Sequence, residues 1–234
     1  MVKALLFDVF GTVVDWRTSL IEEFTASGTA PRTDWAGLVD AWRAAYAPSM
    51  DKVRQGRRPW TNLDALHRDS LATLLPRFGV ALDPAQFEWV LRGWHRLRPW
   101  PDSVAGLTRL KARFTLSPLS NGNVALLTGM AKRAGLPWDL VMSAELFRHY
   151  KPDAEAYLGA CALLDLAPHE VMMCAAHNAD LAAAQSHGLR TAFIARPTEY
   201  GPHQVRDFRA EGDWDYAVGS IEALADALLE EAVP

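Results

Sequence analysis

Cysteine is scarce in this chain of 234 residues: only Cys161 and Cys174 occur, in apolar segments far apart in the sequence. Two such residues do not form the disulfide framework of a small secreted domain. We expect both to be buried free thiols of a cytoplasmic protein. The first residues also lack the charged segment, apolar run and cleavage site of a secretory signal, which agrees with that expectation.

Long apolar runs and a large charge excess are missing as well. No stretch approaches the roughly 20 apolar residues that span a bilayer, so we expect no membrane partner. The formal net charge is −4 and the pI is about 6.0, so the composition does not indicate nucleic-acid binding. Half of the residues are apolar, enough for one large α/β domain or for a core with a smaller unit.

The chain begins with a short apolar stretch that ends in an acid. Residues 4–7 are wholly apolar, as is typical of a strand buried on both faces of a sheet. Asp8 follows, and Gly11 allows a sharp turn. Open α/β sheets bind ligands at the carboxyl ends of their strands, so we interpret Asp8 as a nucleophile that faces a crevice. The alternative is an Asp that caps the turn after the strand.

Residues 15–97 show helical periodicity without a strand signal. Apolar residues recur at spacings of three and four in the stretches 19–24, 35–46, 62–78 and 85–96. At least six of the nine tryptophans lie in this segment: Trp16, Trp35, Trp42, Trp60, Trp89 and Trp94. We predict a helical cap domain at 15–97, inserted after the first strand, with residues 1–14 and 98–234 forming the core domain.

Strands and helices alternate after residue 98. The predicted strands are 114–119, 140–143, 171–175, 191–194 and 216–218, and the predicted helices are 102–113, 124–134, 152–164, 180–186 and 221–231. Single helices between strands predict a parallel, doubly wound, Rossmann-like sheet. Pro118 is unusual for a central strand. The Pro-, Gly- and charge-rich stretch 196–212 is interpreted as a surface loop or the rim of a lid.

Four motifs carry a family resemblance. The run Asp8-Val9-Phe10-Gly11-Thr12 resembles the first motif of the haloacid dehalogenase-like superfamily. Because Phe10 stands two residues after the Asp, the motif resembles that of the branch that contains the type II 2-haloacid dehalogenases. The family's order continues with Ser120-Asn121-Gly122, Lys151-Pro152-Asp153 and the segment 175–180. Each motif is weak alone, but the ordered set is specific. The resemblance covers most of the chain and implies a Rossmann-like core, a helical cap and a homodimer.

Phe10 stands where phosphate-cleaving relatives carry a second Asp as general acid. Phe10 cannot protonate a leaving group, whereas a halide leaves without a proton. The resemblance therefore implies that Asp8 displaces halide from a small 2-haloacid, and that water hydrolyses the resulting ester to the 2-hydroxyacid. Amides around Val9 and Phe10 would bind the substrate anion. Thr12 would orient Asp8, or serve as an ordinary helix N-cap.

The second and third motifs supply polar groups. In the dehalogenases the Ser matching Ser120 helps to bind the substrate carboxylate and the Asn matching Asn121 helps to receive the halide, although Ser-Asn-Gly is also a common turn. Lys151 would keep Asp8 ionised and stabilise the anion formed as the ester collapses. The alternative is a surface Lys before a Pro that starts a helix. Tyr157 would orient Lys151 or simply pack.

The fourth motif departs most from the family. Ala176 replaces an acid of the magnesium-dependent relatives, although Asp180 remains. A hard divalent cation needs several oxygen ligands, so we predict no metal and no other cofactor. Ala175 and His177 stand where the well-studied dehalogenases usually carry Ser and Asn. We interpret His177 as helping Asp180 to activate the hydrolytic water, or as a helix-start histidine that bonds to the backbone.

An arginine of the predicted cap is a candidate anion ligand. Related dehalogenases carry an Arg after an aromatic or apolar residue on the first long cap helix, which matches Arg43. The resemblance implies that Arg43 stabilises the halide or the substrate carboxylate. Arg17 is the alternative, beside Trp16, which would help to wall a small apolar pocket. Both arginines can equally lie on solvated helix faces.

Other activities stay open at this point. A related hydrolase could use Asp8 to open a small cyclic amino acid such as azetidine-2-carboxylate, or to remove fluoride from fluoroacetate. A magnesium-dependent phosphatase conflicts with Phe10 and Ala176. A non-catalytic binding protein conflicts with the presence of Asp8, Lys151 and Asp180 together, although a fold does not fix a function.

Overall fold

A parallel sheet lies at the centre of the computed structural model, which describes residues 1–230. Its six strands follow the order β5-β4-β1-β6-β7-β8. The strands are β1 (Ala4–Phe7), β4 (Thr115–Ser120), β5 (Met142–Ser143), β6 (Val171–Ala175), β7 (Arg190–Ile194) and β8 (Tyr216–Val218). Every neighbouring pair is parallel. The predicted doubly wound, Rossmann-like sheet is confirmed.

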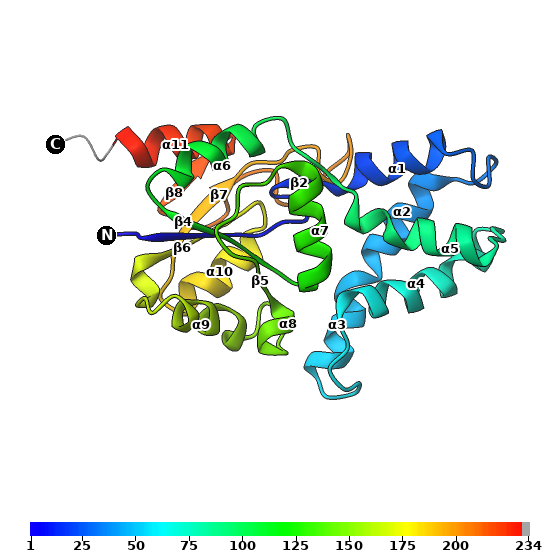
Figure 1. The fold of residues 1–234 in the computed structure, drawn as a ribbon, viewed down its shortest axis with the longest axis horizontal. Helices are drawn as coiled ribbons and strands as arrows, with labels where there is room; N and C mark the ends of the chain where they lie inside the picture. The colour runs from blue at the N-terminus through cyan, green and yellow to red at the C-terminus, as the bar shows by residue number, and fades with distance from the viewer. Residues whose placement is uncertain (231–234) are drawn as a thin grey trace.

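Helices cover both faces of the sheet (Figure 1). They are α6 (Ser103–Lys111), α7 (Val124–Ala134), α8 (Ala144–Phe147), α9 (Ala154–Leu163), α10 (Asn178–Ser186) and α11 (Ile221–Glu230). Successive strand residues point to opposite faces. Leu5 and Phe7 accordingly pack into the cluster that includes residues of α6, α7 and α11. Ala4 and Leu6 pack into the cluster that includes residues of α9 and α10. Because β1 is apolar on both sides, it becomes a central strand.

A helical insertion separates β1 from β4. The chain leaves through β2 (Val14–Asp15) and returns through β3 (Arg98–Pro99), which pair antiparallel. Between them lie α1 (Trp16–Ala26), α2 (Trp35–Ala44), α3 (Tyr46–Arg54), α4 (Leu63–Arg77), α5 (Pro84–Leu91) and the 3₁₀ turn η1 (Arg92–His95). These helices gather at one end of the molecule (Figure 1). A helical insertion after the first strand is confirmed, and we keep the division at 14/15 and 97/98 as a proposal.

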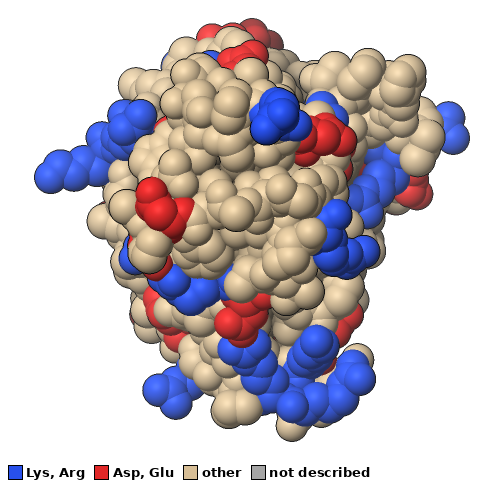
Figure 2. Space-filling view, turned by 90° about the vertical axis from the view of Figure 1, so that its right-hand side faces the viewer, with Lys and Arg blue, Asp and Glu red and all other residues tan. Residues whose placement is uncertain are grey.

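The surface of this end is shown in Figure 2, where Lys and Arg gather at the lower edge, at the level of α3 in Figure 1. The last turn of α3 carries Lys52 and Arg54. Arg54 is paired with Asp51 and Asp153 at 2.9 and 2.8 Å. The positive charge of Arg54 is therefore balanced locally.

Several elements differ from the sequence prediction. The helix predicted at 35–46 ends at Ala44, and a separate helix, α3, begins at Tyr46. The helix predicted at 85–96 ends at Leu91 and continues as the 3₁₀ turn η1. The two-residue strands β2 and β3 and the one-turn helix α8 were not predicted, because elements this short carry no periodic pattern. Residue 231 of the predicted last helix lies outside the described residues.

Pro118 lies inside β4, opposite Phe7 of β1. The backbone N–H of Leu116 donates to Asp139 Oδ2 at 2.8 Å on the side of β5. Residues two apart in a strand present their N–H groups to the same side. Pro118 thus faces that side too, where β5 pairs only from Leu119 onward. The missing proline donor costs no ladder hydrogen bond.

The stretch 196–212 is not simply a surface loop, because Arg196 and Glu199 are buried. Arg196 donates to both carboxylate oxygens of Asp102 at 2.8 and 2.9 Å, and to the carbonyl of Thr12 at 3.0 Å. These bonds tie the start of the loop to the turn that follows Asp8. The interpretation as a surface loop is wrong at these two positions.

Cys161 and Cys174 are free and buried, as predicted. Burial raises the pKa of the Cys161 thiol to about 11 and raises that of Cys174 further. Within residues 1–230, no helix combines the length and the apolar character that crossing a membrane requires. The cytoplasmic location and the homodimer stay predictions.

Candidate active site

A cavity of about 160 Å³ lies at the carboxyl ends of the strands, beneath the inserted helices. Its walls are formed by Asp8, Phe10, Arg43, Tyr46, Asn121, Lys151, Pro152, Tyr157, His177, Ala179 and Asp180. Four loops after different strands and two inserted helices contribute to it. This is the edge at which open α/β sheets bind ligands.

Asp8 is held in place by one backbone hydrogen bond and by three side chains that contact its carboxylate. Its backbone N–H donates to the Cys174 carbonyl at 3.0 Å, which extends the pairing of β1 with β6 by one residue. The Thr12 hydroxyl donates to Oδ2 at 2.8 Å, Lys151 Nζ donates to Oδ1 at 3.1 Å, and His177 Nδ1 lies 3.2 Å from Oδ2. Burial alone would raise the pKa of Asp8, but Lys151 and His177 hold it well below its usual range. Asp8 is therefore a carboxylate.

Lys151 bridges two carboxylates, those of Asp8 and Asp180. Asn121 Oδ1 accepts a hydrogen bond from the Lys151 backbone N–H at 2.8 Å and so fixes the loop before α9. Burial lowers the pKa of the Lys151 ammonium, but Asp180 and Asp8 together raise it above its ordinary value. The Tyr157 hydroxyl donates to Asp180 Oδ1 at 2.6 Å. Tyr157 thus contacts Asp180 and reaches Lys151 only through it.

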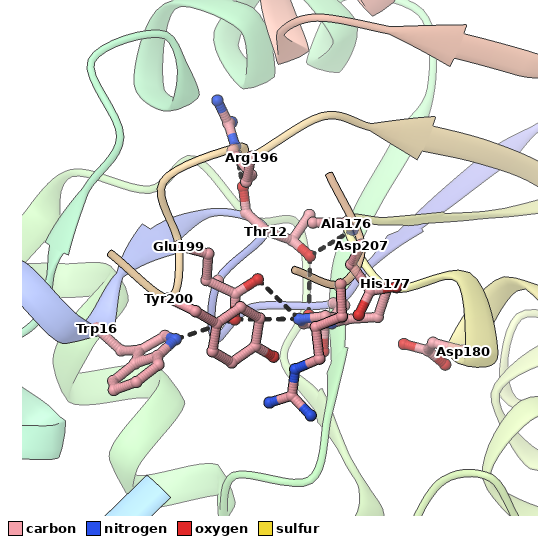
Figure 3. A network of polar contacts seen from close by, with 12 residues as sticks. Thr12, Trp16, Ala176, His177, Asp180, Arg196, Glu199, Tyr200 and Asp207 are labelled. Atoms are coloured by element: carbon pink, nitrogen blue, oxygen red, sulfur yellow. Dashed lines mark hydrogen bonds and ion pairs between the residues drawn. The ribbon is translucent and has the colours of Figure 1, made fainter. Parts of the chain in front are cut away.

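His177 lies between Asp8 and Glu199, and its contact with Glu199 is drawn in Figure 3. Its Nε2 is 3.0 Å from Glu199 Oε2, and Glu199 also accepts a hydrogen bond from Trp16 Nε1 at 2.9 Å. Glu199 is only 1% exposed. The alternative of a histidine bonded to the backbone at a helix start is wrong, because its ring binds carboxylates. Sequence reasoning missed Glu199: a single acid in a charge-rich stretch gives no signal of burial.

The two candidate arginines differ in their surroundings. Arg43 lines the cavity, with its guanidinium carbon 4.4 Å from the centre of the Tyr46 ring and 5.5 Å from that of Trp16. Within residues 1–230, Arg43 Nε has no hydrogen-bond partner and the guanidinium has no ion pair. Arg17 instead binds both oxygens of Asp40, at 2.8 and 2.9 Å. Arg43 is the arginine available to an anionic ligand.

Four predicted site residues do not line the cavity: Val9, Thr12, Trp16 and Ser120. Thr12 acts through Asp8, and Trp16 binds Glu199. Ser120 is buried, and its hydroxyl accepts a hydrogen bond from the Gly122 N–H at 3.1 Å, which is the turn role that its sequence also allowed. Phe10 does line the cavity, edge-on to Tyr46.

Gly11 lets Glu199 approach the turn after Asp8. Its φ is +94°, and a Cβ at this position would lie 2.1 Å from Glu199 Oε1. We expect Gly11→Ala to lower the free energy of unfolding by about 1–3 kcal/mol from backbone strain alone, and to displace Glu199. Urea unfolding measures the change. Gly129→Ala on α7, where a Cβ meets no atom of residues 1–230 within 4 Å, is the matched control and should not destabilise the protein. Equal effects of the two substitutions would contradict the prediction.

The donor set beside Asp8 does not suit a divalent cation. Within the part of the chain that the structure describes, no three His, Cys, Asp or Glu residues are grouped to hold a metal. Ala176 offers no ligand, and its N–H donates to Thr12 Oγ1 at 2.9 Å. The Lys151 ammonium lies against both Asp8 and Asp180. A hard cation would need those oxygens free.

Comparison with known proteins places the chain in a family. The model of the haloacid dehalogenase-like hydrolases matches residues 2–188. The (S)-2-haloacid dehalogenase 1 of Pseudomonas sp. (strain CBS-3) is 30% identical over 206 residues, covering 85% of this chain and 88% of that protein. The (S)-2-haloacid dehalogenase of Xanthobacter autotrophicus is 27% identical, covering 84% and 76%.

Two solved structures are more similar in sequence. The L-2-haloacid dehalogenase PA0810 is 55% identical with a TM-score of 0.94, covering 97% of this chain and 100% of that chain. The defluorinating L-2-haloacid dehalogenase Rha0230 is 47% identical with a TM-score of 0.94, covering 97% and 95%.

The fold and the site are those of a capped Rossmann-like hydrolase with a buried aspartate at the end of its first strand. The chain belongs to the haloacid dehalogenase-like hydrolase family. Its similarity to L-2-haloacid dehalogenases confirms the resemblance inferred from the four motifs.

Proposed function

We propose that this protein hydrolyses the carbon–halogen bond of a small 2-haloacid, through a covalent ester of Asp8 and without a metal. The observation that carries the proposal is an ionised, buried Asp8 that shares a small cavity with Arg43, a cation without an ion pair among residues 1–230. Phe10 occupies the place of a general acid, which suits a leaving group that needs no proton. The L-2-haloacid dehalogenase relatives support the substrate class.

In the first half-reaction, an Asp8 oxygen attacks C2 in line with the carbon–halogen bond. The oxygen–carbon bond forms as the halide leaves with its electron pair. Arg43 and the Asn121 amide line the cavity and supply donors to the anions. Phe10 lines the cavity, and its backbone N–H donates no backbone hydrogen bond within residues 1–230, so we assign it to the substrate carboxylate.

In the second half-reaction, water adds to the carbonyl carbon of the Asp8 ester. The Lys151 ammonium, 3.1 Å from Asp8 Oδ1, stabilises the negative charge that develops on the carbonyl oxygen. Collapse returns the Asp8 carboxylate and releases the 2-hydroxyacid. The oxygen of the water therefore enters Asp8 first.

The function is tested by offering 2-chloropropionate, chloroacetate and fluoroacetate and measuring both halide and 2-hydroxyacid. A single turnover in ¹⁸O-labelled water, followed by mass spectrometry of the Asp8 peptide, tests the ester. We expect one labelled oxygen in Asp8. If the label appears only in the product, the covalent mechanism is wrong.

The role of Arg43 can be separated from that of Arg17. We expect Arg43→Met to lower kcat/KM by about 10²- to 10³-fold, because a desolvated anion loses its charged partner. Arg17→Met removes the pair with Asp40 and should change kcat/KM by less than about threefold. Steady-state halide release measures both. A larger effect of Arg17→Met would reverse the assignment.

Defluorination is the second candidate, favoured by the 47% identity to a dehalogenase described as defluorinating. Fluoride needs strong hydrogen-bond donors as it leaves, and the guanidinium of Arg43, the Asn121 amide and the Tyr46 hydroxyl border the same cavity. A fluoride electrode with fluoroacetate as substrate tests this candidate. Azetidine-2-carboxylate in the same screen tests the alternative of ring opening.

A further inference from the structure

His177 is enclosed by two carboxylates from distant parts of the chain, Asp8 and Glu199, and the Glu199 side of the ring is drawn in Figure 3. Nδ1 lies 3.2 Å from Asp8 Oδ2, and Nε2 lies 3.0 Å from Glu199 Oε2. Trp16 Nε1 holds the other Glu199 oxygen at 2.9 Å. The loop that carries Glu199 is fastened at its start by Arg196. The imidazole therefore has one edge on the nucleophile and the other on a fixed acid.

Charged groups from several elements lie around His177. Asp8 and Glu199 contact the ring directly, while Lys151, Asp180 and Arg43 line the same cavity from other elements. Burial lowers the pKa of His177, but Glu199 and Asp8 raise it well above its ordinary value. The resting ring is thus an imidazolium. Esterification of Asp8 removes one of its two negative partners.

Asp180, the other candidate base, is already engaged. Its Oδ2 is bound by Lys151 Nζ, and its Oδ1 accepts the Tyr157 hydroxyl at 2.6 Å. Both oxygens of Asp180 therefore already accept a hydrogen bond from another side chain. The imidazole Nδ1, in contrast, has Asp8 as its only partner among residues 1–230.

We propose that alkylation of Asp8 converts His177 from an imidazolium into the base of the second half-reaction, with Glu199 as the positioning residue that keeps Nε2 protonated. The inference rests on the proposed function and specifies how its second step is driven. Nδ1 then faces the ester with a free lone pair. Glu199 plays the part that a buried carboxylate plays behind a catalytic histidine in other hydrolases.

With this assignment, every proton of the two half-reactions has a donor and an acceptor. As the Asp8–C2 bond forms and the halide leaves, Nδ1 gives its proton to solvent. Water then adds to the ester carbonyl and transfers one proton to Nδ1. When the bond between the carbonyl carbon and the 2-hydroxyacid oxygen breaks, that oxygen takes the proton. The new carboxyl proton of Asp8 passes to Nδ1 and restores the imidazolium. One proton per turnover is therefore released with the halide.

The order of release is the test. Enzyme in excess is mixed with 2-chloropropionate in weak buffer, and protons, chloride and 2-hydroxypropionate are timed by a pH indicator and rapid quenching. The wild type should release its proton with chloride, before the hydroxyacid. In Glu199→Gln the ring starts neutral, so the proton should appear with the hydroxyacid, and hydrolysis of the ester should slow on the order of 10²-fold. Glu211→Gln, an exposed acid of the same loop, should behave as the wild type.

A second measurement needs no turnover. ¹⁵N-histidine spectra, with the His177 signal identified by its loss in His177→Asn, should show both ring nitrogens protonated at pH 8 in the wild type but not in Glu199→Gln. Trp16→Phe, which removes the indole donor to Glu199, is the substitute variant if Glu199→Gln does not fold. In Trp16→Phe, part of the proton should appear with the hydroxyacid.

The outcomes separate the two proposals. A neutral His177 in the resting wild type, or a proton that appears with the hydroxyacid, overturns the role of His177 while chloride release and labelled Asp8 still support the function. Absence of chloride release from every 2-haloacid overturns the function itself.

Discussion

Asp8→Asn will abolish dehalogenation, lowering kcat by about 10⁶-fold, as removal of the nucleophile does in other covalent hydrolases. The amide is nearly the same size as the carboxylate and can still accept from Thr12, but it is a far weaker nucleophile toward C2. Halide release measures the loss. A variant that retained more than about one per cent of the wild-type rate would show that another group attacks the substrate.

The matched control for this substitution is Asp226→Asn. Asp226 pairs with Arg109 at 2.7 Å on the surface, and both side chains are about half exposed. An exposed pair contributes little, so its loss should change stability by about 1 kcal/mol or less and leave halide release unchanged. Circular dichroism of both variants separates loss of chemistry from loss of fold.

Lys151→Met will have the second large effect, on activity and on stability together. It leaves Asp8 and Asp180 buried without their shared cation, which costs about 3–5 kcal/mol of unfolding free energy. Because Lys151 helps to hold the pKa of Asp8 low, Asp8 should become harder to ionise in the variant. Residual activity should then rise with pH across a range in which wild-type Asp8 is already ionised.

Urea unfolding and a pH–rate profile check both parts of this prediction. Because the pKa of Asp8 is depressed in the folded protein, its ionisation contributes stability above about pH 4, and this stability is lost only as the pH falls below that value. Lys132→Met, at an exposed position of α7, is the control and should reproduce the wild-type profile. An unchanged profile in Lys151→Met would contradict the charge pairing.

Much of the core fold could be predicted because its signals are local. The strands 171–175 and 216–218 were predicted at the bounds found for β6 and β8. Apolar runs between single helices allow little other than a parallel sheet. The breaks after Ala44 and Leu91 were missed because the apolar periodicity continues through them. The β2–β3 pair was missed because antiparallel contacts between residues 14–15 and 98–99 have no signature in either segment.

Some residues of the candidate site could be predicted from local signals, and others could not. Four cavity residues follow strands or lie near helix starts: Asp8, Asn121, Lys151 and Asp180. Strand ends and the order of the motifs were therefore enough to predict that they lie in one site. Arg43 was favoured over Arg17 through the resemblance alone, because helical periodicity does not say which face meets the cavity. Ser120 was expected at the cavity and lies in the turn beneath it.

The order of residues along the chain by itself determined the parallel sheet, the helical insertion and the acid at the end of β1, since each depends on neighbours a few positions away. Only the tertiary structure decided which partners those groups meet. The burial of Glu199 against Gly11, Trp16 and His177 joins segments far apart in the sequence, and no local propensity encodes such a contact. Packing of the whole chain brings the second carboxylate to His177, and with it the charge that sets the protonation of the ring.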